Sequence, residues 1–360
     1  MVLRAMSPDL RLGAQWSVTP ADLDAIATAY GLAWQPPIVL LGGAVNGVVR
    51  VGGDRGAVVV RVHRPWTTPA RLASVHQIQE EVRSQGVPIP PVARTLAGAT
   101  WTVIHDRLVE LTPYVTHDGP ANTWATVEEA GTLLGRLHGA FAAVPDGHLI
   151  PPAYSSYADP ATALQMLDET REVFAAHARE EGYGEAAATR AATTVLLTHL
   201  ARERAAYEGS LPRSLIHGDY GGENVLLRAN KVVAILDFDY MAERERIFDI
   251  AYLLYWTLDR LRSSVGTHLF PDADLRRAGA VLRRYMTSGP ALTAAEWTAL
   301  PFAMARVPLY PIAEAGYASA APYLPSPVQQ TLAFARHVPV ARSLVTDAVR
   351  VRSLLAPERP

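Results

Sequence analysis

The amino-acid sequence predicts an α+β protein of two lobes, an N-terminal lobe built on an antiparallel β-sheet and a larger, mainly helical C-terminal lobe. Two observations support this. Strand-like runs of β-branched residues separated by glycine-rich turns are concentrated in the first third of the chain, and apolar residues recur at helical spacing from about residue 110 onward. We therefore expect an N-terminal lobe of residues 1–108 and a C-terminal lobe of residues 109–360.

The N-terminal lobe is expected to begin its sheet with three antiparallel strands, Ile38–Leu41, Val48–Val51 and Ala57–His63. Glycine-rich segments separate these strands, which is typical of hairpin connections. Because side chains alternate along a strand, the third strand places three valines on one face and Arg61 on the other.

A helix should follow, beginning after Thr68, with proline at its first position, and ending at Gly86. Two more strands are expected at Val92–Thr95 and Thr100–Ile104. The extended stretch 108–115, which contains a proline, is expected to link the two lobes.

The C-terminal lobe carries two capping boxes, in which threonine is followed three residues later by glutamate. They are Thr126 with Glu129 and Thr293 with Glu296, and each predicts the start of a helix. Further elements are expected as helices within 160–207 and 271–288, and as short strands near 225–228 and 232–236.

Composition excludes several kinds of chemistry. The chain has no cysteine, which rules out disulfides, thiolate metal sites and a cysteine nucleophile. Lys231 is the only lysine among 33 basic residues and does not follow a glycine, so a Walker A loop is excluded. A net charge of -2 argues against nucleic acid as a partner. The charged N-terminus and the lack of 18 consecutive apolar residues predict a cytoplasmic protein without membrane association.

The most informative segment runs from His217 to Asp237. It contains Asp219, Asn224 five residues later on the same loop, and Asp237 directly after the next apolar strand. Phosphoryl transfer needs one carboxylate to orient and deprotonate the attacking hydroxyl, and hard oxygen ligands for the magnesium ion that neutralises the phosphates. The spacing therefore indicates a phosphoryl-transfer site.

These residues resemble the catalytic and metal loops of the aminoglycoside phosphotransferase family, which has the protein-kinase-like fold. The similarity extends to Gly42–Asn46, Leu134–His138 and Asp249–Ala251. It implies that Asp219 is the catalytic base and that Asn224 and Asp237 bind Mg²⁺, with ATP as co-substrate. Gly43 and Asn46 would then shape the loop that covers the nucleotide. His217 and Asp249 are expected to support the loop structurally.

The resemblance also implies a cation for the nucleotide phosphates. Protein kinases use a lysine on the third strand, and Arg61 occupies that position here. Its expected partner is a carboxylate on the next helix. His76 lies near that point, and Glu80 one turn further along is the residue we expect to pair with Arg61.

The adenine base is expected to lie against the linker backbone at Glu110 and Leu111.

Three functions remain open at this stage: a small-molecule kinase, a protein Ser/Thr kinase, and a nucleotide-binding module without catalysis. Only 11 residues separate Asp237 from Asp249, too few for an activation segment, and Gly218 stands where protein kinases carry arginine. Both observations favour a small hydroxylated acceptor. The family resemblance allows an aminoglycoside, homoserine, choline or a similar metabolite, and the sequence does not select among them.

Overall fold

The computed structural model describes residues 10–12, 16–42, 46–54, 56–64, 66–145, 147, 149–151, 159–207, 209–263, 269–316 and 325–356. The chain divides into two compact units. The first unit contains residues up to His117, together with Val144–Ala153 and Val233–Leu236, and the remainder forms the second unit. The boundary expected at 108/109 falls inside a strand, and the first unit continues to His117.

A five-stranded antiparallel sheet forms the centre of the first unit, with the strand order β3-β4-β5-β7-β6. The strands are β3 (Trp34–Gly42), β4 (Gly47–Gly53), β5 (Val58–Val62), β6 (Thr102–Ile104) and β7 (Arg107–Pro113). The predicted meander of three strands is confirmed by β3, β4 and β5. A separate two-stranded sheet joins β1 (Leu10–Leu12) to β2 (Trp16–Val18).

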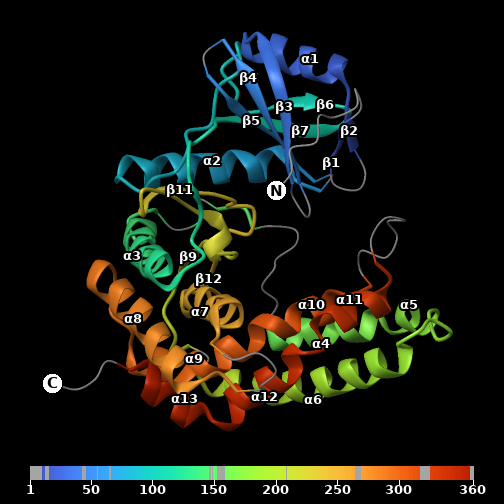
Figure 1. Cartoon of the computed structure of the whole chain (residues 1–360), viewed down its shortest axis with the longest axis vertical. Coiled ribbons are helices and arrows are strands. Elements are labelled where there is room, and N and C mark those ends of the chain that lie inside the picture. Colours follow the sequence, from blue (N-terminus) through green and yellow to red (C-terminus); the bar gives the residue numbers. More distant parts are fainter. Residues whose placement is uncertain are drawn as a thin grey trace. The chain divides into compact units, whose positions relative to one another are not determined.

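Helices α1 (Pro20–Tyr30) and α2 (Pro69–Ser84) lie on opposite sides of this sheet (Figure 1). Leu23, Ile26 and Tyr30 of α1 pack into a buried core with valines of β4 and β5. The start of α2 is confirmed, because the Thr68 side chain accepts a hydrogen bond from the Arg71 amide and Pro69 occupies the first turn. The face toward α1 is buried, whereas Val48, Arg50 and Val59, which alternate with the buried valines, are half-buried.

The prediction of a strand at Val92–Thr95 is wrong. This segment is extended and binds β7 through the Ala93 amide, which donates to the Leu111 carbonyl at 2.8 Å, but it does not pair as a ladder. The next predicted strand is confirmed in shorter form as β6.

The second unit is mainly helical. Its described helices are α3 (Trp124–Phe141), α4 (Pro160–Glu169), α5 (Arg171–Ala175), α6 (Tyr183–Tyr207), α7 (Ile247–Leu261), α8 (Asp272–Ser288), α9 (Ala294–Arg306), α10 (Tyr310–Glu314), α11 (Pro327–Phe334), α12 (His337–Thr346) and α13 (Ala348–Leu355). None of the helices in the described part of the chain has the length and apolar character needed to cross a membrane.

Short strands connect the helices of the second unit. They are β8 (Gly119–Pro120), β9 (Arg213–Ile216), β10 (Val225–Arg228), β11 (Lys231–Ile235) and β12 (Ala242–Glu245). Strand β9 pairs with β12, and β10 lies between β8 and β11. The last residues of β11 belong to Val233–Leu236, the segment counted with the first unit. The two short strands predicted near 225–228 and 232–236 are thus confirmed.

The two predicted capping boxes have different outcomes. Thr293 and Glu296 form the box at the start of α9, as expected. Helix α3 instead begins after Thr123, whose side chain accepts from the Thr126 amide. Thr126 therefore occupies the third position of the helix, and the predicted start at Thr126 is three residues too late.

Helices α3 and α8 approach each other closely because α3 presents glycine at the contact. A Cβ atom on Gly135 would lie 2.4 Å from the Tyr285 carbonyl oxygen, and one on Gly131 would lie 2.8 Å from the Val281 carbonyl oxygen. Any side chain at these positions would push the two helices apart.

Candidate active site

The loop of residues 217–224 follows β9 and leads through a short 3-10 turn, Gly222–Asn224, into β10. Its conformation requires glycine at position 218. Gly218 has a φ of 81°, and a Cβ atom there would lie 2.2 Å from the carbonyl oxygen of Tyr240. Residues with a side chain are strained at such a φ, and here there is also no space for one.

Asp249, near the start of α7, holds the base of this loop. Its carboxylate is fully buried and accepts from the backbone amides of His217 at 2.7 Å and Gly218 at 2.9 Å. His138 of α3 lies 3.1 Å from the same carboxylate. The Asp219 amide in turn donates to Nδ1 of His217 at 3.3 Å. His217 and Asp249 thus have the supporting role expected of them.

Asp219, whose amide binds His217, is half-buried. Its main-chain oxygen accepts from the side-chain amide of Asn224 at 2.8 Å, and its carboxylate oxygen lies 3.4 Å from the same nitrogen. Burial raises the pKa of Asp219 to about 8; hydrogen bonds from Tyr252 and Asn224 lower it, whereas the charges of Asp237 and Glu223 raise it further. A carboxylate with a raised pKa is a stronger proton acceptor, as a catalytic base requires.

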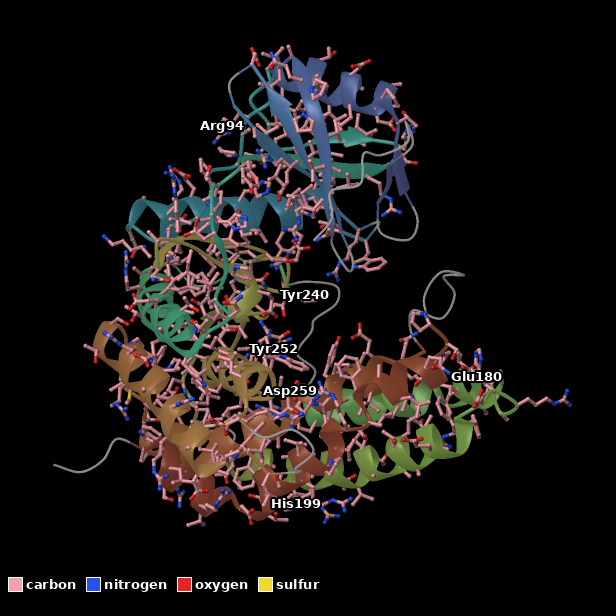
Figure 2. The ribbon with its side chains drawn as sticks, in the orientation of Figure 1. Arg94, Glu180, His199, Tyr240, Tyr252 and Asp259 are labelled. Carbon is pink, nitrogen blue, oxygen red and sulfur yellow. The ribbon has the colours of Figure 1, made fainter. Side chains whose placement is uncertain are left out.

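Tyr252 is a site residue that the sequence analysis did not identify. It lies on α7, three residues after Asp249, and its hydroxyl hydrogen-bonds to the carboxylate of Asp219. Figure 2 shows Tyr252 on the helix that also carries Asp259. The sequence could have indicated Tyr252. Residues three apart on a helix share a face, and Asp249 was already expected to contact the loop.

Asn224 and Asp237 could hold a divalent cation. The amide nitrogen of Asn224 is used in the bond to Asp219, which leaves its oxygen as the atom that could bind a metal. Asp237 lies two residues after the end of β11 and has a φ of 67°, and its charge acts on Asp219. The donor set fits Mg²⁺, which takes a few hard oxygen ligands from protein and the rest from phosphate and water. Among the described residues no cluster of three or more histidine and carboxylate groups could bind a metal alone.

The first unit contains the other residues expected to contact nucleotide. Arg61 lies on β5, on the face opposite Val60 and Val62, which are buried in the core with α1, as predicted. Asn46 is buried just before β4. Gly43 lies outside the described residues.

Glu110 and Leu111 lie inside β7, which corrects the expectation that they form a linker. Residue 110 is paired with Arg61 and residue 111 with Val60 of β5. The Leu111 carbonyl also accepts from the Ala93 amide at 2.8 Å. The strand continues to Pro113, so this backbone belongs to the sheet.

Glu80 has an exposed carboxylate that binds Arg83 one turn along α2, at 2.5 Å. The α2 residue that instead meets the sheet is His76, whose Nε2 lies 2.5 Å from the carboxylate of Glu110. The expected partnership of Glu80 with Arg61 is therefore corrected. Glu80 faces outward although Ile78 and Val82, two residues before and after it, are fully buried.

One unit is built on an antiparallel sheet, and the helical unit carries an Asp–Asn loop and a further Asp. Together with the similar solved structures, these features define a protein-kinase-like fold. A family model described as the phosphotransferase enzyme family (APH) matches residues 38–293, and the chain belongs to this family.

Comparisons with individual proteins agree. The chain is 25% identical over 263 residues to a homoserine kinase of Acidiphilium cryptum (strain JF-5), covering 72% of this chain and 73% of that protein. A microcompartment-associated aminopropanol kinase has a similar structure, with a TM-score of 0.68, 20% identity, and coverage of 92% of this chain and 99% of that one. Amicoumacin kinase hAmiN, solved with AMP-PNP, Ca²⁺ and Ami, has a TM-score of 0.63 at 15% identity, covering 88% and 92% of the two chains.

Proposed function

We propose that this enzyme transfers the γ-phosphoryl group of ATP to a hydroxyl group of a small molecule. The observation that carries the proposal is the surroundings of Asp219, a half-buried carboxylate bonded to Asn224 and Tyr252 on a loop fixed by Asp249. The relatives support it, because the homoserine and aminopropanol kinases are named for hydroxylated small molecules and amicoumacin kinase was solved with AMP-PNP and Ca²⁺.

Asp219 would act as the catalytic base. It would accept a hydrogen bond from the acceptor hydroxyl, orient its oxygen toward the γ-phosphorus and take its proton as the phosphoryl group is transferred. Tyr252 and Asn224 hold the carboxylate in one orientation, which favours in-line attack by a positioned hydroxyl.

Asn224 and Asp237 would bind Mg²⁺, which supplies positive charge against the phosphates during transfer. Arg61 would bind the phosphates, since a guanidinium offers several donors and keeps its charge at every physiological pH. Gly43 and Asn46 would shape the loop over the nucleotide. The long, always-charged side chain of Arg61 thus takes the role that lysine has in most kinases.

A small molecule is favoured over a protein as the acceptor. The segment between Asp237 and Asp249 is occupied by β12, which pairs with β9, and by the first residues of α7. In protein kinases the equivalent segment is a long activation loop that binds the substrate peptide. This chain has no comparable length between the two residues.

The test is Asp219→Ala assayed with a panel of acceptors that includes homoserine, aminopropanol, ethanolamine and aminoglycosides. We expect kcat for the best acceptor to fall at least about 100-fold, with the Kd for Mg²⁺–ATP changed less than about threefold, because the base acts on the acceptor rather than on the nucleotide. Glu243→Gln, at an exposed position of β12, is the matched control and should retain full activity.

An unchanged kcat in Asp219→Ala would remove Asp219 from the mechanism. Nucleotide binding by the wild-type enzyme without turnover of any acceptor would favour the nucleotide-binding module instead.

A further inference from the structure

A group of charged residues at the C-terminal end of α7 has no part in the proposed mechanism. Asp259 of α7 accepts two hydrogen bonds from the guanidinium of Arg336, at 3.2 and 3.0 Å, and its Oδ1 lies 3.4 Å from a guanidinium nitrogen of Arg262. Arg262 directly follows α7, and Arg336 directly precedes α12. Two cations from different parts of the second unit therefore share one carboxylate.

Arg262 is nearly buried, yet its charge is weakly compensated. Its side chain is 11% exposed, and that of Asp259 is 10% exposed. Both carboxylate oxygens of Asp259 already accept from Arg336, and within the described part of the chain Arg262 has only the ion pair at 3.4 Å. Buried charges are normally paired and hydrogen-bonded, and a guanidinium carries five N–H donors. Arg262 therefore has donors to offer to an anionic ligand.

The groups beside this cluster leave its charge balance positive. Nδ1 of His337 lies 3.8 Å from Asp259, but burial lowers the pKa of His337 to about 4, so the imidazole is neutral at neutral pH. Burial also keeps the Tyr255 hydroxyl, which bonds to His337, neutral by raising its pKa well above the usual range. The two guanidiniums thus exceed the one carboxylate by one charge. A site with this balance attracts a carboxylate and repels an ammonium group.

The cluster lies on the same side of α7 as the contact to Asp219. Tyr252, whose hydroxyl binds Asp219, precedes Asp259 by seven residues, which is about two helical turns, so the two side chains share a face (Figure 2). The half-buried Trp256 lies between them, with its ring 6.2 Å from that of Tyr252 and 5.6 Å from that of His337. The base, an aromatic side chain and the positive cluster therefore follow one another along α7.

The length of helix between these groups sets the size of a ligand that could contact both. Seven residues of α-helix rise about 10 Å. One hydrogen bond at each end, each about 2.8 Å long, leaves about 5 Å for the ligand itself. This length suits an extended chain of about three or four carbon atoms, with bonds of about 1.5 Å.

We propose that Arg262, with the added charge of Arg336, binds a carboxylate of the acceptor, so that the preferred substrate is a short hydroxylated carboxylic acid. The inference rests on the proposed function, because it places the reacting hydroxyl at Asp219. It makes the two arginines specificity-determining residues. It also selects among the acceptors that the sequence left open, since homoserine offers a carboxylate to this cluster, whereas ethanolamine, aminopropanol and aminoglycosides offer cations.

The test compares homoserine with homoserine amide, in which a neutral carboxamide replaces the carboxylate. We expect the wild-type kcat/KM for homoserine to exceed that for the amide by about 10- to 100-fold, the usual contribution of charged hydrogen bonds. Arg262→Met should abolish this preference by raising KM for homoserine, with kcat/KM for the amide changed less than about twofold. Because both acceptors carry the same hydroxyl, a general loss of activity would affect them equally.

Two more variants define what Arg262 contributes. Arg262→Lys keeps the charge but not the planar fork of donors, so it should retain part of the preference for homoserine. Arg350→Met, which removes an arginine of α13 paired with Asp272, is the matched control and should retain all of it. Circular dichroism melting checks that each variant is folded. The comparison of the two acceptors with wild-type enzyme needs no variant and remains decisive if Arg262→Met is unstable.

Equal wild-type kcat/KM for homoserine and its amide would overturn the proposal, as would an unchanged preference in folded Arg262→Met. Turnover of aminopropanol or an aminoglycoside in preference to homoserine would also overturn it, while leaving the proposed kinase activity intact. If wild-type enzyme turns over no acceptor, the proposed function fails. Isothermal titration with homoserine and homoserine amide then decides the carboxylate site separately, because equal Kd values would remove it and tighter binding of homoserine would support it.

Discussion

At the scale of single residues, Asp249 fixes the 217–224 loop from outside the loop. Its two carboxylate oxygens accept from two consecutive backbone amides, and one of them also lies against His138. A buried carboxylate with this many donors is stable only while all of its partners remain.

Asp249→Asn should lower the free energy of unfolding by about 2–4 kcal/mol. Asparagine keeps the shape of the side chain but replaces one of the two acceptor oxygens with an NH2 group, so at least one of the three groups that now face the carboxylate loses its acceptor. It should also reduce kcat, since the backbone that carries Asp219 loses a fixed point. Urea unfolding measures the first effect. Asp272→Asn, at an exposed position paired with Arg350, is the control and should change stability by less than about 0.5 kcal/mol. Equal stability of Asp249→Asn and wild type would contradict this account.

The sequence predicted some site residues better than others, and the difference has a physical cause. Asp219 and Asn224 are close in the chain, so a loop brings them together, and a hairpin returns the chain to Asp237 after two short strands. The α2 residue that meets the sheet, for which the sequence favoured Glu80 as the partner of Arg61, depends on which face of the helix lies against the sheet. Spacing along the helix could not decide between His76 and Glu80, and the structure selects His76.

At the scale of elements, the contact between α3 and α8 depends on the absence of side chains. Gly135 lies against the Tyr285 carbonyl and Ser288 of α8, whereas Gly139, one turn later on the same helix, is exposed with nothing within 4 Å of an added Cβ. The two glycines therefore provide a matched pair within one helix.

Gly135→Ala should destabilise the protein by about 1–3 kcal/mol, because the added methyl group forces α3 and α8 apart. Gly139→Ala should stabilise it by about 0.5–1 kcal/mol, since alanine restricts the unfolded chain and favours the helix. Chemical denaturation of both variants measures these changes. Destabilisation of equal size at both positions would show that the helix contact is not the cause.

The elements that the sequence predicted correctly carry strong local signals, such as the alternating valines of β5 and the Thr68–Pro69 start of α2. Helix α1 was not predicted, although Thr19, Pro20 and Asp22 form a readable start signal with a capping box. The segment Val92–Thr95 has strand-like residues, but a strand also needs a partner along its length. Only tertiary structure shows that it has one main-chain bond to β7.

At the scale of the whole chain, stability should depend on pH through His337 of α12. Its Nδ1 lies 2.8 Å from the Tyr255 hydroxyl. Burial lowers the pKa of His337 to about 4; the charge of Asp259 acts in the opposite direction, and the charges of Arg336 and Arg262 lower the pKa further. The folded protein therefore holds this imidazole in its neutral form at neutral pH.

The unfolded chain binds a proton at this histidine near pH 6.5, whereas the folded chain does so only near pH 4. Between these values the unfolded state holds more protons, so stability is fully present above pH 6.5 and falls as the pH approaches 4, by about 2–3 kcal/mol from this group. Unfolding measured at pH 7 and pH 4.5 should show a smaller loss in His337→Asn than in wild type. His199→Asn, at an exposed site on α6, should leave the loss unchanged. An identical pH dependence of stability in wild type and His337→Asn would show that His337 is not its source.

The support that Asp249 gives to the 217–224 loop has a consequence for the thermodynamics of ligand binding. Since His217 and Gly218 are fixed by a carboxylate of the fold itself, the loop has its working shape before a nucleotide or acceptor arrives. Binding then loses little chain entropy at this loop, and more of the contact energy remains for affinity and for lowering the transition state. The 217–224 loop is therefore pre-organised, and segments that become ordered on binding are expected outside this loop.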